Sequence, residues 1–307
     1  MIRSSRSASA RAVIVLVLAS LALAACAPSS ADSERASEPA VAAPADGRVP
    51  DPAPADGRVP GPGPTTTSVP AGGRQADAED PLRVLFTGDS IGVEVAAPAM
   101  AAIGGGGSAV TYFVANPSIP RDPARKALWE ARLAKSDPEV IVVLVGVWER
   151  MGFGEEQLAG QTVTQYRAEV IDPFIDLVTS QGAELVWVSS PLVEDVTASR
   201  QIGFLDEAFR TVGQSDDRVE FIDAAGLVAG PGGEFVTVTT GLGGQPERVR
   251  RVDGTHLCPG GAVLMAAPLV EYLTDRWNVP VDPDWPIGDW RSAKPFENAA
   301  FECPAAG

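Results

Sequence analysis

The chain has 307 residues, of which 45% are hydrophobic, and a formal net charge of −16 at neutral pH. Nucleic acids and anionic membrane faces are bound through basic patches, so this acidic balance argues against both as partners. The sequence contains 1 histidine, and no cluster of His or Cys has the spacing of metal ligands, so no metal is expected.

The first 25 residues have the features of an export signal. A basic start without acidic residues precedes an apolar stretch, 12–25, that is too short to span a bilayer. The stretch ends in Leu23-Ala-Ala-Cys26, which resembles the bacterial lipobox, where the cysteine is diacylated and becomes residue one. Small residues before Cys26 favour a lipoprotein over an ordinary signal peptide with an incidental cysteine. A lipidated Cys26 would anchor the protein to the outer face of the cytoplasmic membrane.

Residues 26–80 are predicted to be this lipidated cysteine followed by a disordered linker. The linker is rich in Pro, Ala, Gly, Ser and Asp, and the heptapeptide at Pro44–Pro50 recurs at Pro54–Pro60. A segment of this composition cannot form a core. We expect it to be a semi-extended spacer that holds the next domain off the membrane, or only a permissive linker.

Residues 81–307 are predicted to form one α/β domain with a substantial core. Five apolar runs predict strands at Val84–Phe86, Val110–Val114, Val140–Val145, Leu185–Val188 and Val219–Ile222. Helix-like segments follow at Val93–Ala102, Ala124–Lys135, Thr164–Ser180, Ser199–Val212 and Gly261–Arg276. Most of the runs are short, β-branched and continuous, which is typical of strands buried on both faces of a parallel sheet. The alternation predicts a sheet covered by helices on both faces, with the ligand site at the carboxyl ends of the strands.

Two segments depart from this alternation. Residues Pro231–Arg251 predict an added hairpin or a long loop. Residues Asn278–Gly307 contain Trp285 and Trp290 among prolines and are expected to wrap the surface. Lipidation of Cys26 leaves a cysteine pair, which suggests a disulfide in an exported chain. A Cys258–Cys303 bridge would tie the tail to the loop after His256; two unpaired buried thiols are the alternative.

Gly88-Asp89-Ser90 follows the first predicted strand and precedes a helix. This places Ser90 at the carboxyl edge of the sheet, near a helix N-terminus whose N–H groups favour developing negative charge. Gly88 permits the sharp turn. Helix capping by Asp89 or Ser90 is the alternative interpretation.

The only histidine, His256, lies three residues after Asp253, in a loop that opens the last helix. Asp253 could hold Nδ1–H of the imidazole and leave Nε2 facing Ser90, which is the arrangement of a Ser-His-Asp triad. A surface histidine, or a buried one bonded to the backbone, is the alternative.

These two motifs together resemble the SGNH (GDSL-type) hydrolase superfamily over 81 to about 276. The resemblance implies a flavodoxin-like three-layer α/β/α sandwich with a five-stranded parallel sheet. It implies Ser90 as nucleophile, His256 as base and Asp253 as orienting acid, with no cofactor. The oxyanion hole would use the N–H groups of Ser90 and Ser118.

The third motif departs from the superfamily pattern. Gly146-Val-Trp148-Glu149 stands where Gly-x-Asn-Asp is usual, so the asparagine that donates to the oxyanion is missing. Removing one such donor typically costs roughly 2.7–4 kcal/mol of barrier. Either Trp148 Nε1–H replaces it, or backbone donors act alone; a core aromatic is the other interpretation of Trp148. The departure resembles SGNH domains attached to bacterial membrane acyltransferases.

The leading interpretation is an envelope-tethered serine esterase that acts on acyl esters. Short acyl chains are expected because no extended apolar lid segment is visible. An O-acyltransferase acting on cell-wall glycan would use the same triad. A catalytically inactive lipoprotein that binds glycan or a partner is favoured by the missing asparagine and disfavoured by the intact Ser90, Asp253 and His256.

Overall fold

The structure is a computed structural model that describes residues 75–115, 119–146 and 162–305. The predicted export signal, Cys26 and nearly all of the predicted linker lie outside the described residues. So do two of the three predicted oxyanion donors, Ser118 and Trp148.

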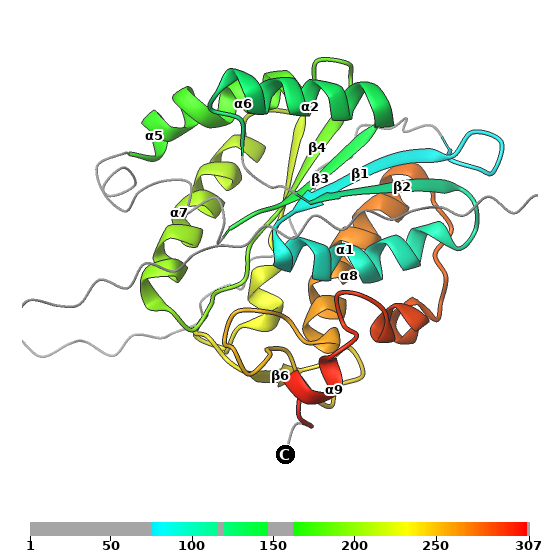
Figure 1. Ribbon diagram of the computed structural model, residues 1–307, viewed down its shortest axis with the longest axis vertical. Coiled ribbons are helices and arrows are strands. Elements are labelled where there is room, and N and C mark those ends of the chain that lie inside the picture. The colour runs from blue at the N-terminus through cyan, green and yellow to red at the C-terminus, as the bar shows by residue number, and fades with distance from the viewer. Residues whose placement is uncertain (1–74, 116–118, 147–161, 306–307) are drawn as a thin grey trace, which may run out of the picture. The chain divides into compact units, whose positions relative to one another are not determined.

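Five parallel strands form a sheet in the order β2-β1-β3-β4-β5 (Figure 1). They are β1 (Leu82–Gly88), β2 (Ala109–Ala115), β3 (Val140–Leu144), β4 (Glu184–Val188) and β5 (Val219–Ile222). Each overlaps a predicted apolar run, and β3 is buried along its whole length. This is the strand order of flavodoxin-like sheets, so the predicted fold class is confirmed.

Helices cover both faces of the sheet and complete three layers (Figure 1). One face carries α1 (Ser90–Gly104) and α8 (Pro259–Trp277); the other carries α2 (Pro123–Ser136), α5 (Val163–Tyr166), η1 (Arg167–Ile171), α6 (Asp172–Val178) and α7 (Val196–Gly213). Successive side chains of a strand point to opposite faces of the sheet. In β1, Val84 and Phe86 therefore pack in the core beneath α1 and α8, while Leu85 packs in the core on the other face.

The predicted helix Thr164–Ser180 is interrupted by a π-helical turn, η1, between α5 and α6. Pro173 lies at the start of α6 and has no N–H with which to continue an α-helical ladder. The N–H of Asp172 bonds the carbonyl of Arg167, five residues back. The wider turn therefore accommodates the proline without ending the helical segment.

The two irregular segments follow the prediction. Strands β6 (Val238–Thr240) and β7 (Pro246–Arg248) form an antiparallel hairpin. After α8 the tail forms η3 (Trp285–Ile287), η4 (Asp289–Ser292) and α9 (Ala299–Glu302). Trp285 and Phe296 are buried in the α1–α8 core, so the tail wraps this layer. Of the helices in the described ranges, none has the length and apolarity that a membrane span requires.

Asp206 on α7 is a buried carboxylate in the second core. It accepts hydrogen bonds from the indole N–H of Trp187 at 3.3 Å and from the backbone N–H of Ser190 at 3.0 Å. Burial raises the pKa of Asp206 to about 7, against the opposing effect of the hydrogen bonds from Trp187 and Ser190. The folded state therefore binds a proton that the unfolded state releases at lower pH.

Asp206→Asn is expected to flatten the pH dependence of stability. A raised carboxyl pKa contributes stability below the unfolded value of 3.8, and this contribution is lost as pH rises to about 7. An amide oxygen at the Oδ1 position of Asn can still accept from Trp187 and from Ser190, whose N–H lies 3.2 Å from Oδ1, and the amide does not titrate. The free energy of unfolding, measured with urea, should fall between pH 4 and pH 8 in both proteins. We expect the fall to be smaller in the variant than in the wild type, by roughly 3 kcal/mol. Equal slopes in both proteins would contradict the prediction.

Candidate active site

The Gly88-Asp89-Ser90 turn joins the end of β1 to the start of α1. Asp89 is the N-cap of α1, and Ser90 is the first residue of the helix. The turn needs glycine because the helix crosses close to β3: a β carbon on Gly88 would lie 2.4 Å from the carbonyl oxygen of Leu144. One on Gly92 would lie 2.7 Å from the same atom. The two glycines thus let Ser90 sit at the carboxyl edge of the sheet.

Asp89 does more than cap the helix. Its Oδ1 accepts from the N–H groups of Ile91 and Gly92 at 3.0 and 3.3 Å. Its Oδ2 accepts from the N–H of Gly146 at 3.2 Å, beyond the end of β3. This bond joins the first motif to the third. The N–H of Ser90 is left without a hydrogen-bond partner among the described residues.

Ser90, His256 and Asp253 form one hydrogen-bonded chain. Nε2 of His256 lies 2.8 Å from Oγ of Ser90, and Nδ1 lies 2.7 Å from Oδ2 of Asp253. Ser90 is exposed, whereas the His256 side chain is 31% exposed. The structure therefore brings together the three residues that the sequence motifs predicted, at an edge that solvent can reach.

The loop between Asp253 and His256 is closed by the carboxylate itself. Oδ1 of Asp253 accepts from the backbone N–H groups of Thr255 and His256, both at 2.9 Å. Partial burial would raise the pKa of Asp253, but the hydrogen bonds from the His256 ring and from these two N–H groups outweigh it and lower the pKa. Asp253 is consequently an anion, with one oxygen for the backbone and one for the imidazole.

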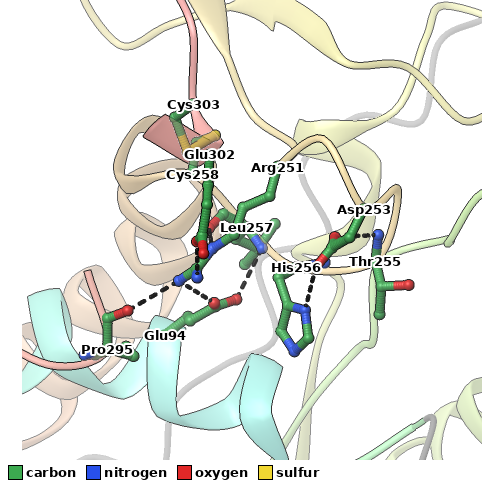
Figure 2. Close-up of a disulfide and its surroundings, with 10 residues drawn as sticks. All are labelled: Glu94, Arg251, Asp253, Thr255, His256, Leu257, Cys258, Pro295, Glu302 and Cys303. Atoms are coloured by element: carbon green, nitrogen blue, oxygen red, sulfur yellow. Dashed lines mark hydrogen bonds and ion pairs between the residues drawn. A yellow bond between two sulfur atoms is a disulfide. The ribbon is translucent and has the colours of Figure 1, made fainter. Parts of the chain in front are cut away.

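A second carboxylate, Glu94, projects from α1 beside this loop and was not predicted (Figure 2). It accepts from the N–H of Leu257 at 2.7 Å and pairs with Arg251 at 2.6 Å. Burial raises the pKa of Glu94 to about 7, although the Leu257 N–H and Arg251 act to lower it. One sequence signal could have found it: Glu94 is the only charged residue in α1.

The C-terminal tail reaches the same loop. Cys258 and Cys303 form a disulfide, and Glu302 pairs with Arg251 (Figure 2). The N–H of Val252 also donates to the carbonyl of Glu302 at 3.0 Å. The tail is therefore attached to both sides of the segment that carries His256.

The third predicted oxyanion donor, the N–H of Ser90, lies within the described residues, whereas Ser118 and Trp148 do not. Within the described ranges, no group of three or more His, Cys, Asp or Glu side chains is placed to hold a metal ion.

Fold and site together define a class: a flavodoxin-like α/β domain with a Ser-His-Asp chain at the carboxyl edge of its sheet. The chain belongs to the family DUF459, described as "Protein of unknown function (DUF459)", whose model matches residues 83–272. None of the curated proteins matches it.

Two solved structures show what the chain is similar to. A member of the lipolytic protein G-D-S-L family from Veillonella parvula is 16% identical with a TM-score of 0.40, over 62% of this chain and 97% of that one. A catalytic mutant of Axe2, an acetylxylan esterase from Geobacillus stearothermophilus, is 16% identical with a TM-score of 0.39, over 65% of this chain and 94% of that one. These likenesses are too distant to transfer an activity to this chain.

Proposed function

We propose that this protein is a serine esterase that hydrolyses short-chain acyl esters in the bacterial cell envelope. One observation carries the proposal: Ser90 Oγ, His256 Nε2, His256 Nδ1 and Asp253 Oδ2 are linked by contacts of 2.8 and 2.7 Å. Such a chain can transfer the serine proton to the imidazole and hold the imidazolium in place.

The reaction proceeds through an acyl-enzyme. Ser90 Oγ attacks the ester carbonyl while its proton passes to Nε2 of His256. The tetrahedral intermediate then expels the alcohol, which takes that proton. Water, deprotonated by His256, attacks the acyl group and releases the acid and the free serine. Asp253 keeps Nδ1 protonated throughout.

The N–H of Ser90 at the start of α1, which has no hydrogen-bond partner among the described residues, supports one part of an oxyanion hole. The carboxylate of Asp89 uses the next two N–H groups, and the carbonyl of Asp89 accepts from the third, that of Val93. Within the part of the chain that the structure describes, the N–H of Ser90 is thus the one N–H in the first turn of α1 that is available to a developing oxyanion. Ser118 and Trp148 complete the proposed set of donors.

The proposal extends to the location of the enzyme. An export signal that is cleaved before Cys26 would leave the protein lipid-anchored through Cys26 on the outer face of the cytoplasmic membrane, with the domain beyond the Pro- and Ala-rich linker. The substrates are then esters within the envelope, including acylated cell-wall glycans.

A fluorophosphonate probe tests the proposal on the full chain. The wild type is expected to be labelled and to release nitrophenol from nitrophenyl esters, most rapidly from those with short acyl chains. Ser90→Ala should show neither labelling nor hydrolysis. A folded wild-type protein that the probe does not label would instead favour a binding protein, and full activity in Ser90→Ala would exclude Ser90 as the nucleophile.

A further inference from the structure

The Glu94 side chain lies between the helix of the nucleophile and the loop of the base. Its carboxylate belongs to α1, and Figure 2 shows it directed at Arg251 and Leu257. Residues four apart on a helix share one face, so Ser90 and Glu94 are presented one above the other. The helix therefore contacts the His256 loop twice: at the imidazole through Ser90 and at Leu257 through Glu94.

Arg251 is the first residue of this loop and bonds the rest of it from within. Its Nε donates to the carbonyl of Leu257 at 3.0 Å, and its backbone N–H donates to the carbonyl of His256 at 2.9 Å. A further N–H of the guanidinium donates to the carbonyl of Pro295 at 3.0 Å. Leu257, next to the base in sequence, is thus held at its N–H by Glu94 and at its carbonyl by Arg251.

Stability alone is a poor explanation for this ion pair. The Glu94 side chain is 2% exposed and that of Arg251 is 11% exposed, so both charges are largely removed from water. The desolvation penalty of such pairs commonly matches or exceeds their attraction, and apolar side chains of similar volume stabilise a fold as well. What apolar side chains cannot do is fix one loop geometry through directed hydrogen bonds.

We propose that Glu94 is a positioning residue: its carboxylate fixes the 251–257 loop against α1 and so sets the hydrogen bond between His256 and Ser90. The inference rests on the proposed esterase function. Glu94 exchanges no proton with the substrate, so the acyl-enzyme mechanism is the same with or without it. Glu94 instead determines the fraction of time for which His256 and Ser90 are aligned for proton transfer.

Two substitutions separate positioning from packing. Glu94→Leu removes both contacts, whereas Glu94→Gln keeps an oxygen for the N–H of Leu257 but loses the charge. We expect kcat to fall about 100-fold in Glu94→Leu and about 10-fold in Glu94→Gln, with KM changed less than about threefold. Rates should be divided by the number of serines titrated with the fluorophosphonate, because a purely structural defect lowers the number of active molecules and not kcat per active serine.

Glu184→Gln is the matched control. Glu184 is also a partly buried carboxylate paired with an arginine, Arg276, at 3.3 Å, but it begins β4 at the opposite edge of the sheet. Its kcat per titrated serine should equal that of the wild type. Arg251→Lys is the second variant if Glu94→Leu does not fold: a lysine keeps the charge but cannot bond two carbonyls and a carboxylate in a fixed fork, so kcat should again fall about 10-fold.

The inference would be overturned if kcat per titrated serine were unchanged in Glu94→Gln and also in Glu94→Leu, or in Arg251→Lys where Glu94→Leu does not fold. The proposed esterase function would be unaffected by that result. A wild type that is neither labelled nor active would overturn the proposed function and the inference together. The two failures are therefore distinguishable from the wild-type measurement.

Discussion

Asp253→Asn is expected to reduce kcat for ester hydrolysis about 10⁴-fold while leaving the fold unchanged. Oδ1 of Asp253 accepts two backbone N–H groups, and the amide oxygen of Asn can accept both. The loop should therefore keep its shape. At the Oδ2 position, which lies 2.7 Å from Nδ1 of His256, the amide presents N–H donors. The imidazole must then accept at Nδ1, so its proton moves to Nε2 and it cannot take the proton of Ser90.

The measurement is kcat for a short-chain nitrophenyl ester, together with the thermal midpoint of unfolding. Asp216→Asn is the matched control. Oδ1 of Asp216 accepts from the backbone N–H of Arg218, two residues later, just as Oδ1 of Asp253 accepts from that of Thr255. Asp216, however, lies in the turn before β5, at the far edge of the sheet. We expect it to retain the wild-type kcat. A kcat within 10-fold of the wild type in a folded Asp253→Asn protein would show that Asp253 does not select the tautomer of His256.

Removing the disulfide should produce the largest loss of stability. The Cys258–Cys303 bridge joins residues 45 apart, and breaking a loop of this length lowers the free energy of unfolding by about 4 kcal/mol. For a domain of this size the thermal midpoint should fall by roughly 8–16 °C in Cys258→Ser/Cys303→Ser. We also expect lower kcat, because the bridge holds the tail that supplies Glu302 to Arg251.

Cys26→Ser is the control for this experiment, since it removes the third cysteine and leaves the bridge intact. Its unfolding midpoint should equal that of the wild type. Two reactive thiols in the unreduced, unfolded Cys26→Ser protein would contradict the prediction, because they would show that the bridge is not formed in the isolated protein.

The sequence was sufficient for the fold because local patterns specify it. Short, β-branched apolar runs such as Val140–Leu144 favour buried strands over helices, and the segments between them have helical periodicity. The π-helical turn before Pro173 was missed, since a proline in a helical pattern predicts a break or a kink with no particular geometry.

The triad was predictable from two short motifs, whereas the groups that support it were not. The hydrogen bond from Leu257 to Glu94 joins residues 163 positions apart, and that from Gly146 to Asp89 joins residues 57 apart. No short sequence motif indicates that a carboxylate accepts a hydrogen bond from a backbone N–H so far away in the chain. The one signal that could have indicated Glu94 is that it is the only charged residue in α1. The roles of Ser118 and Trp148 stay predictions from the sequence.

The point at which the linker joins the domain bears on what the enzyme can reach. The N–H of Ala76 donates to the carbonyl of Trp277, the last residue of α8, while the first residue of that helix follows the His256 loop. A helix of 19 residues is about 28 Å long, so the chain enters the domain about that far from the base. Under the proposed lipid anchor, the linker would therefore leave the domain well away from Ser90. It would not obstruct the approach of a large substrate to the catalytic edge of the sheet.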